Sequence, residues 1–118
     1  MRWSDAARPY RPGEVLLLLF PYTGAVGAKK RPALVLADTG DADVVVARVT
    51  SEPARDTLDV EIKAWKQAGL KLPSVVRVHK IATLDRALVE RTLGRLHSED
   101  WASVRARLRE LWEPVIAR

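Results

Sequence analysis

No cysteine occurs in the sequence, which excludes a disulfide framework, a thiolate nucleophile and any metal site built on cysteine sulfur. Histidine is almost as scarce. His79 and His97 are the two present, too few for a metal site built from histidine. Carboxylates alone could still bind magnesium. We nevertheless predict no metal and no other cofactor.

Long hydrophobic runs are also missing. The longest apolar run, 15–20, is far shorter than the roughly 20 residues that a membrane-spanning helix needs, so it predicts a buried strand. The amino terminus lacks the cationic and then apolar plan of a signal peptide. We therefore expect a soluble, cytoplasmic protein with no membrane partner.

The length of 118 residues is typical of one domain, and we predict a single domain over 1–118 whose residues 1–10 form a flexible arm. The net charge is +5, and fourteen of the twenty basic residues are arginine, the side chain best suited to phosphate. This balance favours an anionic partner, either nucleic acid or an acidic protein segment. A solvated basic surface would show the same charge.

The apolar pattern predicts strands at 14–20, 33–37, 44–50, 58–62, 74–80 and around 89–93. The first strand is apolar on both faces, as a central strand would be. In the fourth, Leu58, Val60 and Ile62 alternate with polar residues, so one face is expected to meet solvent. A short turn is expected to begin near Thr83.

The carboxyl end is predicted to be helical. Ser98 is a suitable N-cap, and Glu99 and Asp100 bring negative charge to the first turn. Apolar residues recur at helical spacing at Trp101, Val104, Leu108, Leu111 and Val115. Pro114 is expected to end or bend the helix. The fold class is mainly β, a small barrel with a C-terminal helix packed against it.

An ordered set of short motifs resembles the MazF/PemK toxins, in particular the PemK-like branch. The motifs are GEV at 13–15, FPYTG at 20–24, KRPALVL at 30–36, VARVTS at 46–51, WKQAGL at 65–70, PSVVRV at 73–78, IATLD at 81–85 and LGRL at 93–96. The resemblance covers about 11–112. It implies an SH3-like barrel, a homodimer, sequence-selective cleavage of single-stranded RNA, and an antitoxin whose acidic, disordered segment lies in the RNA groove.

Metal-free RNA cleavage uses the neighbouring 2′-hydroxyl as nucleophile, so the site needs a base, an acid and positive charge near the phosphorane. Arg31 follows a glycine-containing loop at the mouth of a buried strand, and the matching arginine of the family is catalytic. Thr50, and with it Ser51, ends the third strand, where the family uses a threonine to hold a phosphate oxygen. Away from the resemblance, Arg31 reads as a strand-end arginine, and a threonine and serine at a strand end read as a turn or cap.

Arg77 and His79 form a second group. Alternation places them together on the strand face opposite Val76 and Val78, a face that we expect to be wet. Some PemK-like members have arginine and aspartate here, assigned to proton transfer. Histidine replaces that aspartate in this chain and titrates near physiological pH, so it either keeps the proton-transfer role or only contacts RNA.

Other residues are candidates for RNA contact. Lys29 and Lys30 are expected to bind the backbone, with an affinity that falls as salt rises. Lys80 falls where many MazF relatives have glutamine, and would bind phosphate without reading a base. The set is completed by Glu14, which also suits a simple strand start, and by Tyr22, a candidate for base stacking.

Two other functions stay open. The related CcdB proteins poison DNA gyrase from a similar barrel through the C-terminal helix, and the run LWEP at 111–114 is compatible with such a contact surface. The second alternative is an RNA-binding barrel that has lost catalysis, for which the histidine at position 79 is the one supporting feature.

Overall fold

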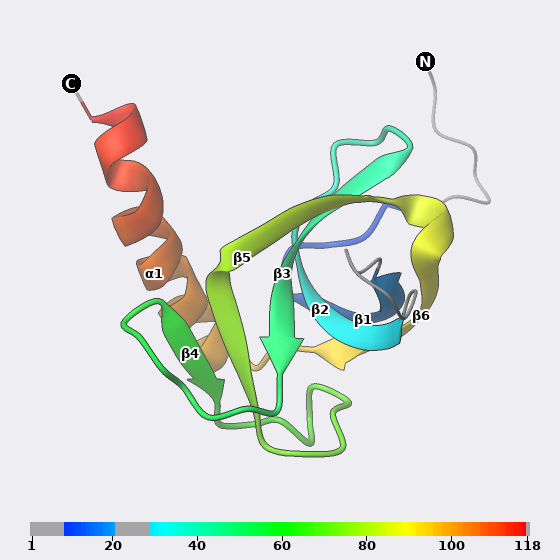
Figure 1. Cartoon of the computed structure of the whole chain (residues 1–118), viewed down its shortest axis with the longest axis horizontal. Helices are drawn as coiled ribbons and strands as arrows, with labels where there is room; N and C mark the ends of the chain where they lie inside the picture. The colour runs from blue at the N-terminus through cyan, green and yellow to red at the C-terminus, as the bar shows by residue number, and fades with distance from the viewer. Residues whose placement is uncertain (1–8, 21–28, 118) are drawn as a thin grey trace.

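The computed structural model describes residues 9–20 and 29–117, and it is mainly β with a C-terminal helix, as predicted (Figure 1). The elements are β1 (Glu14–Phe20), β2 (Lys29–Ala37), β3 (Asp43–Thr50), β4 (Asp59–Ile62), β5 (Ser74–Asp85), the short 3-10 helix η1 (Arg86–Leu88), β6 (Val89–Arg95) and α1 (Ser98–Ile116). The largest differences from the predicted strands are in β2 and β5. β2 begins four residues earlier than expected, and the turn expected near Thr83 lies inside β5.

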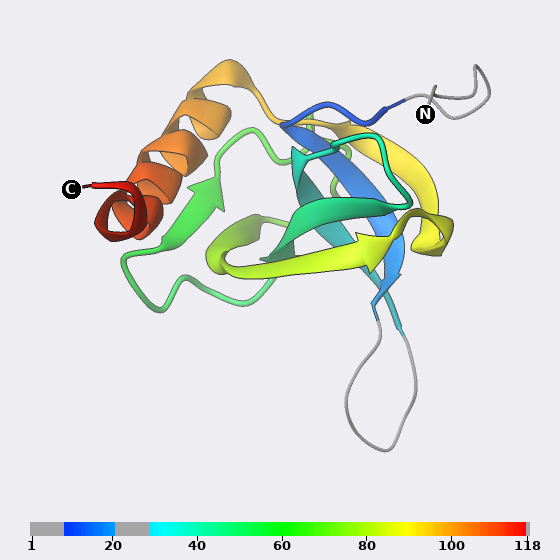
Figure 2. The ribbon, with the colours of Figure 1, turned by 90° about the horizontal axis from the view of Figure 1, so that it is seen from above.

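The strands form one antiparallel sheet in the order β4-β5-β3-β2-β1-β6. Within the described residues β4 and β6 do not pair with each other, so this sheet is open and the closed barrel is not confirmed. The sheet is nevertheless strongly curved, and in Figure 2 β5 passes across β2 and β3. No helix in the described part of the chain has the length and apolar character to cross a membrane.

Apolar residues cover both faces of the central strands, which confirms the expectation for the first strand. Within β1, Val15 belongs to one buried cluster, and Leu16 and Leu18 belong to the other. The first cluster includes residues of α1 and of the 63–73 linker. The second is formed by β1, β2 and β3, with residues of β5 and β6 packed against it. Burial on two faces explains why these strands read as continuous apolar runs.

β5 contains an irregularity that separates two halves of the strand. Ala47 pairs with Ile81 whereas Arg48 pairs with Arg77, so 78–80 have no partners on β3. A bulge of this kind bends a strand and re-aims its side chains, and Figure 1 shows β5 turning sharply. Strict alternation therefore does not describe the face on which His79 lies.

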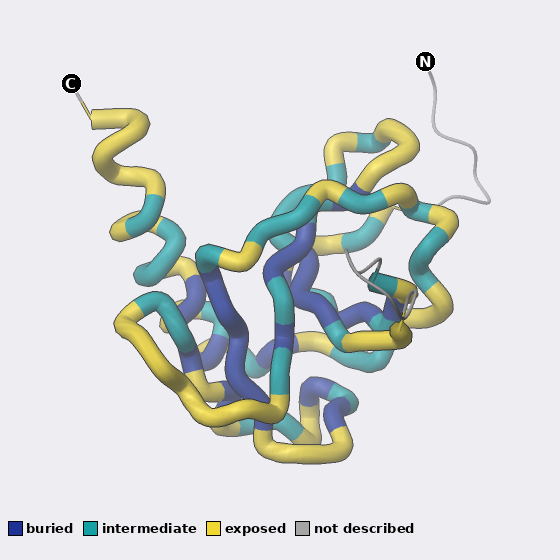
Figure 3. Tube along the Cα trace, viewed as in Figure 1, coloured by how far each residue is buried: buried dark blue, intermediate teal, exposed yellow. Residues whose placement is uncertain are grey.

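The helix differs from its prediction at both ends. His97, not Ser98, is the N-cap, because its side chain accepts a hydrogen bond from the backbone N–H of Glu99 at 3.2 Å. Pro114 does not end the helix, since it lies inside α1, which continues to Ile116. The first turns of α1 pack on the sheet through Val104 and its neighbours, while the last turns are exposed (Figure 3).

Candidate functional site

A pocket of about 420 Å³ opens where β1, β2 and β3 meet the 63–73 linker and β6. Its lining includes Leu17, Arg31, Pro32, Arg48, Val49, Thr50, Ser51, Glu52, Gly69, Leu70, Lys71, Leu72, Ser74, Arg91 and Leu93. The structure thus brings together the arginine, threonine and serine that the sequence selects from two separate motifs. The pocket lining does not include six of the other described candidates: Glu14, Lys29, Lys30, Arg77, His79 and Lys80.

Positive charge dominates this pocket. Arg48, Lys71 and Arg91 join Arg31 around it, against the single carboxylate of Glu52. Sequence reasoning missed these three cations. Arg48 could have been found, because it stands two positions before Thr50 on the same strand and alternation places both on one face. Lys71 and Arg91 lie in the linker and in β6, and no local pattern links them to the pocket. Four cations around one concave surface suit a phosphodiester.

The hydroxyl of Thr50 is oriented by the chain that follows it. Its Oγ1 accepts a hydrogen bond from the backbone N–H of Glu52 at 3.1 Å, at the point where β3 ends. An oxygen that accepts this bond can still donate its own hydrogen outward. The turn-forming role expected of a strand-end threonine and the phosphate-binding role are therefore compatible in this residue.

Arg77 lies in a different environment from the wet strand face that we expected, and that expectation was wrong. Its side chain is 10% exposed, and its Nε lies 3.7 Å from Oδ1 of Asp59, whose side chain is 1% exposed. The reason is tertiary: β4 pairs along β5 and places Asp59 directly opposite Arg77. This buried ion pair holds the guanidinium on the sheet.

His79 lies within the bulge of β5 and is partly buried, with 26% of its side chain exposed. Its Nε2 lies 3.9 Å from Oδ2 of Asp56, a residue of the loop before β4. Arg77 and His79 are therefore close in the chain, and each of them lies next to a carboxylate from the 51–59 region.

Sheet register relates the buried pair to the pocket. Arg48 is paired with Arg77 on β5 and with Ala33 on β2, and Arg31 lies two positions from Ala33. Cross-strand partners share a face of the sheet, so the side chains of Arg31, Arg48 and Arg77 leave the same face. β3 alone separates β2 from β5, which corresponds to two strand spacings, or about 10 Å. The two arginines therefore lie within reach of one extended polyanion.

The remaining candidates occupy other places. Lys29 and Lys80 are exposed, and Lys30 is exposed but forms an ion pair with Glu90 at 2.5 Å. Glu14 lies at the other end of β1, where its Oε1 accepts a hydrogen bond from the backbone N–H of Arg11 at 2.5 Å. Tyr22 lies outside the described residues.

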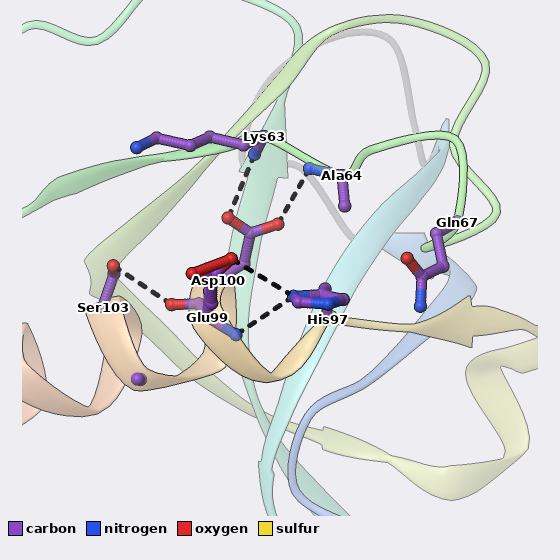
Figure 4. Close-up of a pocket in the computed structure, with 8 residues that line it drawn as sticks. Lys63, Ala64, Gln67, His97, Glu99, Asp100 and Ser103 are labelled. Atoms are coloured by element: carbon purple, nitrogen blue, oxygen red, sulfur yellow. Dashed lines mark hydrogen bonds and ion pairs between the residues drawn. The ribbon is translucent and has the colours of Figure 1, made fainter.

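A second concave region, of about 630 Å³, lies at the start of α1 (Figure 4). Asp100 is buried there and accepts hydrogen bonds from the backbone N–H groups of Lys63 at 3.1 Å and Ala64 at 2.9 Å. These bonds tie the end of β4 to the helix. Asp100 has a structural explanation, and the pocket brings together neither the arginines nor the hydroxyls described above.

Two glycines, Gly69 of the pocket lining and Gly94 of β6, meet where the linker crosses β6. A Cβ on Gly69 would lie 2.0 Å from the carbonyl oxygen of Leu93, and a Cβ on Gly94 would lie 2.5 Å from that of Ala68. Gly69 also has φ of +84°, a conformation that other residues rarely adopt. The backbones touch directly at this crossing, so only glycine fits.

We expect Gly69→Ala to lower the free energy of unfolding by about 2–5 kcal/mol, the sum of backbone strain and overpacking. Gly13→Ala is the matched control, since Gly13 has φ of +97° but its Cβ would meet Trp101 at an ordinary 3.6 Å. Urea denaturation of both variants measures the difference. Equal losses of stability in the two would show that the crossing is not close-packed.

Comparison with known proteins gives consistent results. Residues 11–112 match the sequence model described as PemK-like, MazF-like toxin of type II toxin–antitoxin system. No curated protein sequence is significantly similar to the chain. Among solved structures, a MazE–MazF structure from Deinococcus radiodurans is 25% identical, with a TM-score of 0.73 over 91% of this chain and 98% of that one.

Two more distant structures share the fold. The Mycobacterium tuberculosis toxin MazF-mt6 is 20% identical, with a TM-score of 0.70 over 87% of this chain and 97% of that one. An endoribonuclease in complex with its cognate antitoxin from a mycobacterial species is 19% identical, with a TM-score of 0.66 over 86% and 93%.

Proposed function

This chain belongs to the family of PemK-like, MazF-like toxins of type II toxin–antitoxin systems, and on that premise we propose that it is an endoribonuclease that cuts single-stranded RNA without a metal. The observation that supports this most directly is the cationic pocket in which Arg31, Thr50 and Ser51 come together. We further propose that the curved sheet corresponds to the SH3-like barrel that the family resemblance implies.

In the proposed reaction, the 2′-hydroxyl oxygen attacks the adjacent phosphorus and the bond from phosphorus to the 5′-oxygen breaks. Arg31 and Arg48 stabilise the negative charge that grows on the non-bridging oxygens, and Thr50 donates a hydrogen bond to one of them. The products are a 2′,3′-cyclic phosphate and a 5′-hydroxyl end.

Proton transfer is assigned to the group on β5. A base takes the proton of the 2′-hydroxyl and an acid gives one to the departing 5′-oxygen. His79 is the side chain suited to this exchange near neutral pH, and Arg77, held by Asp59, adds positive charge beside it. Arg77 and Arg48 are direct cross-strand neighbours, which supports the assignment of this group to the same phosphate as the pocket.

We also propose that the protein acts in the cytoplasm as a homodimer and is neutralised by a cognate antitoxin. An antitoxin segment that is acidic and disordered would fit the cations of the pocket and so exclude RNA. The structures of relatives with bound antitoxin support this part of the proposal.

The test is cleavage of a mixed RNA pool by the purified chain in the presence of a chelator. We expect defined fragments, and sequencing of their 5′ ends should reveal one preferred cleavage motif. Binding without cleavage over a wide range of pH would instead support a barrel that has lost catalysis.

A protein-binding poison of the CcdB type remains the second candidate because of one observation. The end of α1 exposes apolar side chains, with Trp112 at 45%, Val115 at 68% and Ile116 at 71%. Such exposed residues suit contact with a protein. Inhibition of gyrase supercoiling, with the RNA pool left intact, would favour this function over the nuclease.

A further inference from the structure

Three potential metal ligands converge at the junction of the 51–59 region with the bulge of β5. One ligand atom each from Asp56, Asp59 and His79 lies within 4.8 Å of the others. We propose that these side chains bind a divalent transition-metal ion, with Zn²⁺ as the best match, and that the bound ion inhibits the nuclease. The inhibitory part rests on the proposed function, whereas the binding site does not.

The first argument is that two residues of this group each have a buried polar atom without a hydrogen bond. Asp59 has a side chain only 1% exposed, and its Oδ1 has no hydrogen-bond partner. The Nδ1 atom of His79 is buried and also has none. Buried polar atoms are nearly always satisfied, so two such atoms in one cluster call for an explanation. A metal ion in the cluster would give the Asp59 carboxylate a further partner and bind the ring nitrogen that faces Asp56, since Nε2 of His79 lies 3.9 Å from Oδ2 of Asp56.

The carboxylates are already oriented for this role. Oδ2 of Asp59 accepts a hydrogen bond from the backbone N–H of Arg55 at 2.7 Å, and Oδ1 of Asp56 accepts one from that of Leu58 at 2.8 Å. Each carboxylate therefore has one oxygen held by the backbone. The other oxygen of Asp56 lies 3.9 Å from Nε2 of His79, and the other oxygen of Asp59 lies 3.7 Å from Nε of Arg77. Outer hydrogen bonds of this kind fix the orientation of metal ligands.

The ligand types decide which ion fits. One imidazole and two carboxylates suit Zn²⁺ better than Mg²⁺, which prefers oxygen alone. Zn²⁺ with three protein ligands keeps a fourth position for water. Tetrahedral bonds of about 2.0–2.1 Å require ligand atoms roughly 3.4 Å apart. The separations of up to 4.8 Å must then shrink by about 1 Å or more, a change within reach of Asp56, whose side chain is 46% exposed.

Arg77 weakens this site but does not abolish it. Its Nε lies 3.7 Å from Oδ1 of Asp59, too far for a hydrogen bond, so the two groups attract each other only through their charges. Two carboxylates outweigh the single guanidinium, so these acidic groups still attract a cation. We therefore expect a modest affinity for the metal ion, which is consistent with reversible binding.

Inhibition follows from the chemistry of the bound histidine. A ring nitrogen that donates its lone pair to a metal ion cannot accept the proton of a 2′-hydroxyl. The ion would also compete with Arg77 for Asp59 and loosen the guanidinium that the carboxylate holds. Zinc would thus remove the proton carrier and disturb its neighbour, while the cationic pocket stays intact.

The test is calorimetric titration of the full chain, freed of metal, with zinc chloride. We expect one ion per chain at this site, with the affinity at least about tenfold lower in His79→Ala and in Asp56→Asn. Asp56→Asn keeps the oxygen that accepts the Leu58 hydrogen bond, so it removes the charge with little effect on folding. His97→Ala is the matched control, because His97 also lies near a single carboxylate, that of Glu99 at 4.0 Å.

Affinity within twofold of wild type in His97→Ala supports the site. Unchanged affinity in His79→Ala, or no binding by wild type, overturns it. RNA cleavage is then measured with and without saturating zinc, and we expect zinc to inhibit the wild type but not the residual activity of His79→Ala. If no variant cuts RNA under any condition, the proposed function fails, whereas the titration still decides the metal site.

Discussion

Replacing Arg31 by alanine is expected to lower the rate of RNA cleavage by about 100- to 1,000-fold, the usual cost of removing one group that stabilises a developing oxyanion. Arg31 is exposed at the pocket and contributes little to the core, so the variant should fold normally. Single-turnover cleavage of a defined RNA in the presence of a chelator measures the rate, and a thermal melt verifies folding.

The matched control is Lys29→Ala, an exposed cation two positions earlier on β2 that does not line the pocket. This variant should weaken RNA binding mainly at low salt and leave the saturated rate unchanged. Arg48→Ala tests the residue that the sequence did not reveal, and we expect a loss close to that of Arg31→Ala. Cleavage at the wild-type rate by both arginine variants would remove the proposed catalytic centre.

The second large effect concerns stability, because a buried ion pair connects three segments at the end of β2 opposite the end that lines the pocket. Both side-chain oxygens of Asp38, whose side chain is fully buried, accept hydrogen bonds from Arg86, at 2.6 and 2.8 Å. The backbone N–H groups of Tyr10 and Gly40 donate to the same carboxylate. Arg86→Ala would leave this charge buried and unpaired, and we expect it to cost about 3–5 kcal/mol of unfolding free energy.

The same pair predicts a pH dependence. The hydrogen bonds from Arg86, followed by those from the two backbone N–H groups, hold the pKa of Asp38 below its usual range, although burial opposes them. A lowered pKa in the folded state gives stabilisation that is present above about pH 4 and is lost as the pH falls through the folded-state value. The difference in stability between wild type and Asp38→Asn should therefore shrink below about pH 4.

Urea denaturation across this pH range makes the measurement. Glu110→Gln is a suitable control, since Glu110 forms an exposed helical ion pair with Arg107 at 2.6 Å and should cost less than about 1 kcal/mol. If Arg86→Ala were no more destabilising than Glu110→Gln, the buried pair would not contribute to the fold as described.

Local sequence patterns were sufficient for most of the secondary structure. The bounds of β1 were predicted without error because apolar residues on both faces end at the proline after Phe20. The predicted N-cap of the helix was wrong by one residue. Serine is a preferred N-cap residue, but in this chain the imidazole of His97 accepts the capping hydrogen bond. The bulge in β5 leaves no mark on the apolar pattern.

The residues that line the pocket also differ in whether the sequence alone could identify them. Arg31 and Thr50 are identified from motifs within single strands, and their proximity follows from the pairing of β2 with β3. Lys71 and Arg91 reach the pocket because the linker crosses β6 at two glycines, a contact between segments far apart in the chain. No sequence window contains that information.

By itself, then, the sequence determined the family, the mainly β class with its final helix, and the motif residues at the cationic pocket, because these depend on periodicity and on residues close in the chain. Only the tertiary structure decided that Arg77 is buried against Asp59, that His79 lies in a bulge beside Asp56, and that the sheet stays open. The physical reason is that burial and charge pairing depend on which distant segment covers a side chain, and alternation along one strand cannot specify that segment.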